Sequence, residues 1–272
     1  MDKIKIETTH GTISVIDGGG SGPSVMMIHG NSLNAALFSP LMSSRLAGNY
    51  RFVAFDLPGH GDSPRAVNPG KDYSLAAYAS MVRELVRVLG LGMPVLFGHS
   101  LGGHIAMQAL AGGLDCRGLF IVGTPPLGSP PDYAAAFNLV ATGDWMFRAE
   151  LPAEEIKKTA AACMPPGIPA PAELARAIAS TDPRARLELG ISMGRDILHD
   201  EAAFLASWPR PVAITIGEHD TFIKRSYLEG LTVPSLWGGS IRTIAGAGHC
   251  PQVDAPEQLT AMLGEYLDGL EA

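Results

Sequence analysis

The sequence predicts an α/β protein with a mostly parallel central sheet flanked by helices and a helical cap inserted after the sixth strand. Three observations lead to this prediction. Short apolar runs alternate with helical patterns along the first half of the chain, which is typical of a parallel sheet covered on both faces. Glycine-rich and polar residues follow several of these runs, at the strand ends where such sheets bind ligands. Between residues 127 and 208 the strand-like runs disappear, and short helical segments alternate with proline-rich breaks.

The strands can be placed one by one along the chain. The first two, at residues 3–8 and 12–17, surround a turn at His10-Gly11. Residues 25–28 form a continuous apolar run, as expected of a central strand that is buried on both faces. The remaining strands are expected at residues 51–55, 94–97, 118–122, 211–216 and 240–245.

Helices are expected between these strands and at the end of the chain. Residues 73–89 carry apolar side chains at helical spacing, and Gly90 ends the pattern. A second helix, rich in small residues, begins near Gly103. The last helix of the chain carries a stripe of large apolar side chains on one face: Leu259, Met262, Leu263, Tyr266, Leu267 and Leu270.

These patterns divide the chain into a core and a cap. The core is expected to comprise residues 1–126 and 209–272, and the cap residues 127–208. Within the cap, Asp182-Pro183 is a helix start, because aspartate suits the capping position and proline the first helical position.

The composition limits the classes of function. Hydrophobic residues make up 46% of the 272 residues, which is enough for a substantial core without disulfides. The net charge of −7 and the lack of any basic run argue against a nucleic-acid partner. The eight histidines form no spaced ligand set, so neither a metal nor a cofactor is expected.

The compartment is indicated by the cysteines and by the apolar runs. Cys116, Cys163 and Cys250 are odd in number and widely scattered, which fits a reducing compartment. The first residues lack the long apolar region of a signal peptide, and no run has the length of a membrane-spanning helix. We therefore expect a cytoplasmic protein without a membrane partner.

The motif Gly98-x-Ser100-x-Gly102 lies between a predicted strand and a predicted helix. In this context it predicts a tight turn in which Ser100 adopts a strained conformation and its hydroxyl stands clear of the sheet. The glycines are needed because a side chain at either position would collide with the strand or the helix. The alternative is a turn whose serine has no catalytic role, since the five-residue pattern also occurs by chance.

With this motif in its strand–turn–helix context, the sequence resembles the α/β-hydrolase superfamily over nearly its whole length. The resemblance implies that Ser100 is the nucleophile, Asp220 the acid and His249 the general base, in the chain order that this fold uses. It also implies an oxyanion hole formed by the backbone N–H groups of Asn31 and Leu101. Two alternatives remain: Glu218 competes with Asp220 for the role of the acid, and His249 could be a surface-loop histidine.

Among serine members of the superfamily, the sequence resembles the N-acyl-homoserine lactonases, which open the lactone ring of bacterial quorum signals. The shared stretches are residues 28–32, 55–61, 100–105, 123–126 and 181–186, of which the last two are the more telling. The acid differs, because Asp220 stands where some lactonases of this kind carry a glutamate. A serine nucleophile excludes the aspartate-nucleophile routes of epoxide hydrolases and haloalkane dehalogenases.

The resemblance implies hydrolysis of a small-molecule carboxylic ester or lactone through an acyl-enzyme, with N-acyl-homoserine lactone as the specific candidate. One alternative is a carbon–carbon bond hydrolase that acts on ring-cleavage diketones with the same three residues. Another is a ligand receptor built on the hydrolase fold, which binds in the same pocket without turnover. The cap is too thin to bury all its large apolar side chains, so Phe137, Trp145, Met146 and Met164 are expected to line the substrate pocket.

Overall fold

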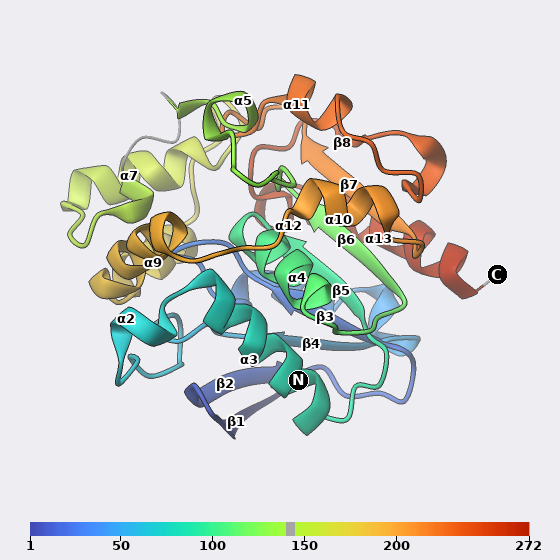
Figure 1. The fold of residues 1–272 in the computed structure, drawn as a ribbon, viewed down its shortest axis with the longest axis horizontal. Coiled ribbons are helices and arrows are strands. Elements are labelled where there is room, and N and C mark those ends of the chain that lie inside the picture. Colours follow the sequence, from blue (N-terminus) through green and yellow to red (C-terminus); the bar gives the residue numbers. More distant parts are fainter. Residues whose placement is uncertain (140–144, 272) are drawn as a thin grey trace.

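The computed structural model describes residues 1–139 and 145–271. Its eight strands form one sheet in the order β1-β2-β4-β3-β5-β6-β7-β8 (Figure 1). The two edge pairings β1–β2 and β2–β4 are antiparallel, and the other pairings are parallel. The strands are β1 (Asp2–Thr8), β2 (Gly11–Asp17), β3 (Ser24–Ile28), β4 (Arg51–Phe55), β5 (Val95–His99), β6 (Gly118–Val122), β7 (Val212–Gly217) and β8 (Arg242–Ile244). The predicted mostly parallel sheet is confirmed.

The central strands are buried along their whole length. Every residue of β3, β5, β6 and β7 is buried, which explains why these strands are apolar without alternation. Each face of the sheet therefore packs against helices. α3 (Leu75–Val88) and α4 (Leu101–Ala111) cover one face. α1 (Ser39–Met42) and α13 (Pro256–Glu271) cover the other, where Phe120 packs between Phe97 and Tyr266.

Several short helices connect these elements. They are η1 (Ala35–Phe38), η2 (Arg45–Gly48), α2 (Pro69–Asp72), α11 (Arg225–Glu229), η4 (Trp237–Gly239) and α12 (Pro251–Asp254). The sequence patterns predicted no helix between β3 and β4, where η1, α1 and η2 lie. The helix predicted at residues 73–89 begins instead after Ser74, because the Ser74 hydroxyl accepts a hydrogen bond from the N–H of Ala77 and caps α3.

The cap lies between β6 and β7. Its described helices are α5 (Tyr133–Ala136), η3 (Trp145–Phe147), α7 (Ala153–Ala162), α8 (Ala172–Ser180), α9 (Pro183–Arg195) and α10 (Glu201–Ser207). α7 and α9 lie together at one side of the molecule, whereas α10 packs on α4 of the core (Figure 1). The carboxylate of Asp182 accepts a hydrogen bond from the N–H of Arg184, so α9 starts with the aspartate cap expected from the sequence.

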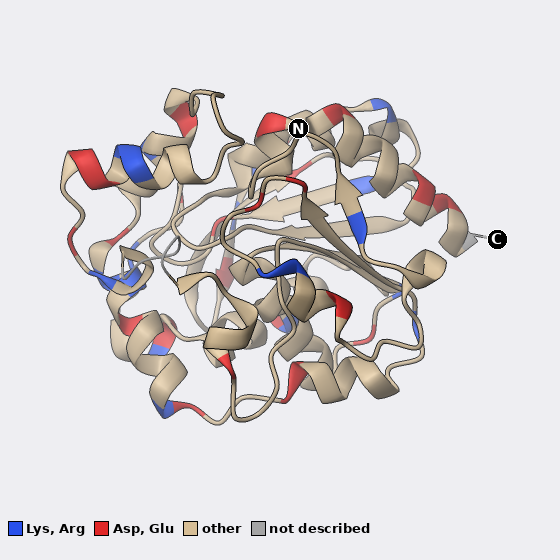
Figure 2. Ribbon diagram, turned by 90° about the horizontal axis from the view of Figure 1, so that it is seen from above, with Lys and Arg blue, Asp and Glu red and all other residues tan. Residues whose placement is uncertain are grey.

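The surface carries charges of both signs. In the view of Figure 2, acidic and basic residues are intermixed along the helices and loops. Among the helices of residues 1–139 and 145–271, none has both the length and the hydrophobicity that crossing a bilayer requires.

Candidate active site

Ser100 lies in a strained turn between β5 and α4. Its backbone has φ of 52° and ψ of −120°, a conformation that residues other than glycine rarely adopt. Neighbouring groups hold it there: the N–H of Ser100 donates to the carbonyl of Val122 at 2.9 Å, and the Thr124 hydroxyl donates to the carbonyl of Ser100 at 2.8 Å. The strain places the hydroxyl at the carboxyl edge of the sheet and at the amino end of α4.

The two glycines of this turn are required by close packing. A Cβ atom at Gly98 would collide with the backbone of Gly103, and one at Gly102 would collide with the carbonyl of Ile28. The backbone of this turn thus lies so close to its neighbours that only glycine fits at positions 98 and 102.

His249 and Asp220 come from two loops at the same edge of the sheet, after β8 and β7. Nδ1 of His249 lies 2.7 Å from Oδ2 of Asp220, whose side chain is fully buried. The other carboxylate oxygen accepts hydrogen bonds from the N–H groups of Phe222 and Ile223 at 2.9 and 3.3 Å. These bonds orient the carboxylate, which in turn orients the imidazole and leaves Nε2 unprotonated in the neutral ring.

Asp220 also determines the basicity of His249. Burial by itself lowers the pKa of the imidazole, but the charge and the hydrogen bond of Asp220 outweigh burial and raise that pKa above its ordinary value. A histidine of this kind can accept a proton from a hydroxyl group. Ser100 and His249 line one small cavity, of about 20 Å³, so the structure brings nucleophile and base candidates together.

Glu218, the competing acid, points elsewhere. Its Oε2 accepts a hydrogen bond from the N–H of Gly246 at 2.8 Å, on the exposed side of the loop that carries His249. The geometry therefore favours Asp220 over Glu218 as the partner of the imidazole.

Asn31 and Leu101, the oxyanion-hole candidates, flank Ser100. Asn31 lines the small cavity, and its amide Nδ2 donates to the carbonyl of Met146 in the cap at 2.9 Å. Leu101 follows Ser100 as the first residue of α4. The loop before Asn31 is fixed by His29, which accepts from the N–H of Leu57 at 3.0 Å and contacts the carbonyl of Gly30 at 2.8 Å.

His99 also lines the small cavity, although no sequence pattern predicted a role for it. Its Nε2 lies 2.8 Å from the carbonyl of His249, so its N–H holds the backbone of the base candidate. Burial, with the nearby charge of His249, lowers the pKa of His99 to about 3, and the ring stays neutral. The only sequence feature that could have pointed to His99 is its position next to Ser100. Its contact with His249 joins residues that are far apart in the sequence.

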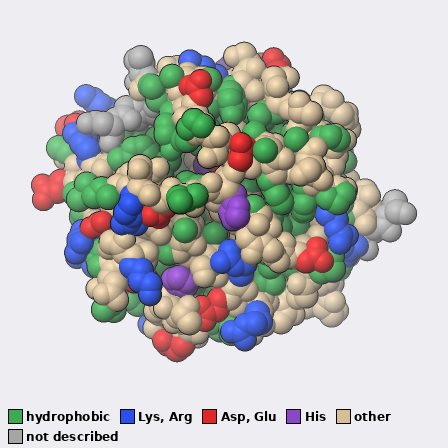
Figure 3. Space-filling view, viewed as in Figure 1, with side chains coloured by type: hydrophobic (Ala, Val, Ile, Leu, Met, Phe, Trp, Pro, Cys, Tyr) green, Lys and Arg blue, Asp and Glu red, His purple; other side chains and the backbone are tan. Residues whose placement is uncertain are grey.

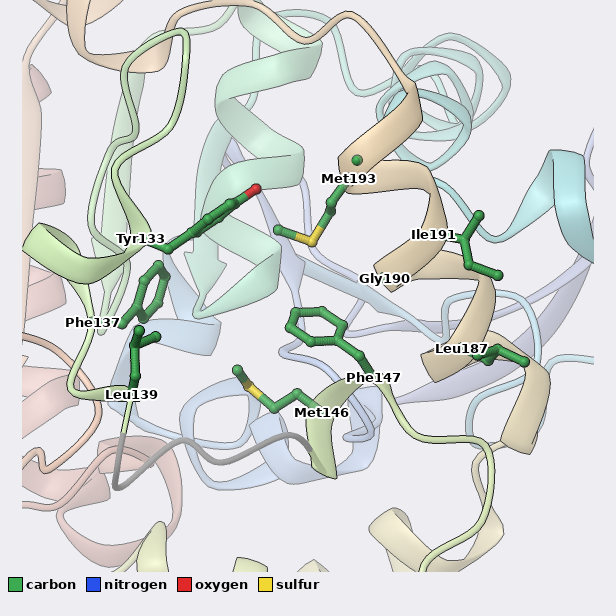
Figure 4. A pocket seen from close by; sticks show the side chains of 10 residues that line it. Tyr133, Phe137, Leu139, Met146, Phe147, Leu187, Gly190, Ile191 and Met193 are labelled. Carbon is green, nitrogen blue, oxygen red and sulfur yellow. The ribbon is translucent and has the colours of Figure 1, made fainter.

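A second, larger cavity lies in the cap. Its volume is about 520 Å³, and hydrophobic side chains dominate its lining: Tyr133, Phe137, Leu139, Met146, Phe147, Leu187, Ile191 and Met193, with Gly190 and Gly194 (Figure 4). Met146 lines both cavities, so the large one adjoins the small one. Hydrophobic side chains are also exposed across this part of the surface (Figure 3).

The four predicted pocket residues lie in different places. Trp145 and Met146 line the small cavity, and Phe137 and Met146 line the large one. Met164 is 5% exposed and lines neither, because the chain beside it packs on Gly248 of the loop that carries His249. Within the described part of the chain, no group of three or more His, Cys, Asp or Glu side chains is arranged to hold a metal ion.

Comparison with known proteins defines the class. The sequence profile of the alpha/beta hydrolase family matches residues 25–262. The chain therefore belongs to the alpha/beta hydrolase family, and it is a hydrolase that acts on ester bonds. This confirms the resemblance inferred from the motifs.

Several individual proteins are similar to this chain in structure or in sequence. The structure is similar to a mutant of the N-acyl homoserine lactonase AidH complexed with N-hexanoyl homoserine lactone, with a TM-score of 0.92 and 30% identity over 99% of this chain and 98% of that chain. A pimeloyl–acyl-carrier protein methyl ester esterase of Stenotrophomonas maltophilia is 27% identical, over 92% of this chain and 95% of the relative. An esterase from Thermogutta terrifontis, 23% identical with a TM-score of 0.79 and full coverage of both chains, shares the fold.

Proposed function

We propose that this protein is a serine hydrolase that opens N-acyl-homoserine lactones through an acyl-enzyme formed on Ser100. The observation that carries the proposal is the 2.7 Å contact between His249 and Asp220, at a cavity that Ser100 also lines. The similarity to AidH supports the choice of substrate, because that protein was solved with N-hexanoyl homoserine lactone and has 30% identity over nearly the whole chain.

In the first half of the reaction, Nε2 of His249 takes the proton of the Ser100 hydroxyl as its oxygen attacks the lactone carbonyl. The N–H groups of Asn31 and Leu101 stabilise the resulting oxyanion, and each such donor is worth about 3 kcal/mol. Asp220 holds the imidazole in its tautomer and stabilises the imidazolium. The ring oxygen then leaves the carbonyl carbon and takes the proton from His249. It becomes a hydroxyl group on the homoserine part, which is now bound to Ser100 as an ester.

In the second half, His249 takes a proton from water, and the hydroxide attacks the ester carbonyl on Ser100. Collapse of this intermediate returns a proton to Ser100 and releases the open-chain N-acyl-homoserine. Every group that this scheme requires lies at the carboxyl edge of the sheet, under the cap.

The lining of the large cavity favours a substrate with an apolar acyl chain. None of its lining residues, all from the described part of the chain, carries a formal charge. A ring-cleavage diketone with a carboxylate would leave that charge unpaired in such a cavity, whereas an alkyl chain gains about 0.8 kcal/mol for each methylene that it buries. This observation favours the lactonase over the carbon–carbon bond hydrolase.

Turnover tests the proposal. Purified protein is incubated with butanoyl, hexanoyl and decanoyl homoserine lactones, with simple p-nitrophenyl esters and with a ring-cleavage diketone, and product is counted per chain. We expect many turnovers of the lactones, and we expect Ser100→Ala to lose at least about 10³-fold in kcat while it still folds. Diketone turnover without lactone opening, or binding of one ligand per chain without product, would contradict the proposal.

The free cysteines bear on where this reaction takes place. All three are unpaired and buried. Unpaired cysteines are typical of proteins kept in a reducing compartment, so we place the reaction in the cytoplasm, where it would remove quorum signals that enter the cell.

A further inference from the structure

Two of the cysteines meet where the cap contacts the loop of His249. Cys163 follows the last residue of α7, and its carbonyl accepts hydrogen bonds from the N–H groups of His249 and Cys250 at 2.9 and 3.3 Å. The packing leaves no room for a side chain, since a Cβ atom at Gly248 would lie 2.6 Å from the same carbonyl. The end of α7 is therefore fixed against the residues on both sides of the imidazole.

The backbone hydrogen bond from Cys250 to Cys163 brings the two side chains close enough to interact. This side-chain interaction is the largest influence on both: it lowers the pKa of Cys163 and raises the pKa of Cys250. A positive charge on His249 also favours the thiolate of Cys163. The pair thus consists of one thiol that ionises more readily than an isolated buried thiol and one that stays protonated.

A small oxidant could reach the two thiols from the candidate active site. Cys163 lines the small cavity together with Ser100 and His249, whereas Cys250 is fully buried behind it. A volume of about 20 Å³ has room for little more than one water-sized molecule. Hydrogen peroxide is close to that size.

We propose that Cys163 and Cys250 are a peroxide-sensitive dithiol that closes to a disulfide between the cap and the loop of His249 and thereby inactivates the hydrolase. The Cys163 thiolate attacks one oxygen of hydrogen peroxide, which forms a sulfenic acid and releases hydroxide. The Cys250 thiol then displaces the hydroxyl of the sulfenic acid as water and completes the disulfide. Peroxide is reduced by two electrons, and the two thiols are oxidised by two.

The bond would change the site because of where it lies. A disulfide requires a sulfur–sulfur distance of about 2.05 Å and a narrow range of dihedral angles, so we expect the backbone next to His249 to shift as the bond forms. The imidazole depends on its 2.7 Å contact with Asp220 and on the support of its own carbonyl by His99. A small misplacement of such a group costs much of the rate. The loss of activity rests on the proposed function; formation of the disulfide does not.

The third cysteine provides a matched control. Cys116 is equally buried, and its Sγ contacts the carbonyl of Gly118 at 3.3 Å, at the start of β6. Burial raises the pKa of Cys116 to about 12, so it remains a protonated thiol. Peroxide should leave it unchanged.

The test uses the full chain in its native state. Protein is treated with hydrogen peroxide, its remaining thiols are alkylated, and peptides are mapped by mass spectrometry before and after dithiothreitol. We expect a cross-linked peptide that joins Cys163 to Cys250 and free Cys116. We also expect loss of most of the ester hydrolysis in parallel with cross-linking, and its recovery on reduction.

Variants separate the possible outcomes. Cys116→Ala should behave as the wild type. Cys163→Ala should form no disulfide and should show no loss of activity that dithiothreitol restores. Cys250→Ala should also form no disulfide, because its oxidation stops at the sulfenic acid of Cys163. Thermal unfolding shows whether each variant is folded, and the wild-type mapping decides the case without any variant. Absence of the cross-link in native wild-type protein overturns the proposal. A cross-link with unchanged activity overturns the switch. A cross-link in a protein that hydrolyses no ester or lactone counts against the proposed function and leaves the dithiol established.

Discussion

Asp220 and Glu218 are two residues apart, but they make different contacts: the first with the imidazole of His249 and the second with the N–H of Gly246. Asp220→Asn keeps the size of the side chain but favours the wrong tautomer of His249. We expect it to lower kcat by about 10⁴-fold. Glu218→Gln keeps the acceptor for Gly246 and should change kcat by less than a few fold. Steady-state kinetics on one lactone compare the two, and equal losses would reverse the assignment.

The pH dependence of the reaction follows from the same contact. The general base must be unprotonated, so kcat/KM should rise with pH through the pKa of His249. Asp220 raises that pKa above the ordinary value of 6.5, so the midpoint of the acid limb should lie above 6.5 in the wild type. In Asp220→Asn the raising charge is gone and burial remains, so the residual activity should show an acid limb at lower pH. A midpoint that moves upward, or does not move, would contradict this account.

At the scale of elements, a segment at the start of α9 fixes the cap to the core. The Tyr73 hydroxyl donates to the carboxylate of Asp182 at 2.6 Å, and the N–H of Asp182 donates to the carbonyl of Gly59 at 2.8 Å. One turn later, the guanidinium of Arg186 donates to four groups. These are the carbonyls of Arg148, Ala149 and Ile178 at 3.0, 2.8 and 3.4 Å and the hydroxyl of Ser32 at 3.4 Å. Ser32 is adjacent to Asn31, so this contact joins the cap to the loop of the proposed oxyanion-hole residue.

Arg186 and Arg184 offer a matched pair of substitutions on α9. Arg186 is 3% exposed, and burial lowers its pKa although Asp182 opposes the shift. Arg186→Met would leave several buried carbonyls without their donor, and we expect it to lower the free energy of unfolding by about 2 kcal/mol or more. Arg184 makes an exposed ion pair with Glu188, so Arg184→Met should cost about 0.5 kcal/mol or less. Urea unfolding measures both, and similar values would show that Arg186 is not a structural link.

The sequence predicts elements well where the pattern is local. The eight strands, α3, α4 and the turn at Ser100 follow from short apolar runs, helical spacing and the position of two glycines. The helices η1, α1 and η2 were not predicted, because a helix of four residues has no period to detect. The role of His99 and the contact of Cys163 with the loop of His249 depend on residues more than 80 positions away. Met164 is buried for the same reason, since its neighbours pack on Gly248.

At the scale of the whole molecule, cap and core share one hydrophobic core. Leu174 of α8 and Leu189 of α9 belong to the same buried cluster as Leu57 and Tyr78 of the core. The cap is therefore seated on the core by apolar packing as well as by the contacts of Asp182 and Arg186. The small cavity is lined by residues of both core and cap, whereas the large cavity is lined by cap residues alone, so cap side chains form most of the surface that a substrate's acyl chain would touch.

We therefore expect the large cavity of the cap to set the preference for acyl-chain length, and Gly194 allows this to be tested. Gly194 lines the large cavity, and a Cβ atom there would meet no other atom within 4 Å. Gly194→Leu should therefore fill part of the cavity without a clash, and replacing glycine in α9 should stabilise the helix by up to about 1 kcal/mol. We expect kcat/KM for decanoyl homoserine lactone to fall by about tenfold, while the value for the butanoyl lactone stays the same. The short substrate is the control for an intact site, because it need not reach residue 194. A parallel fall for both lactones would show that the acyl chain binds outside this cavity.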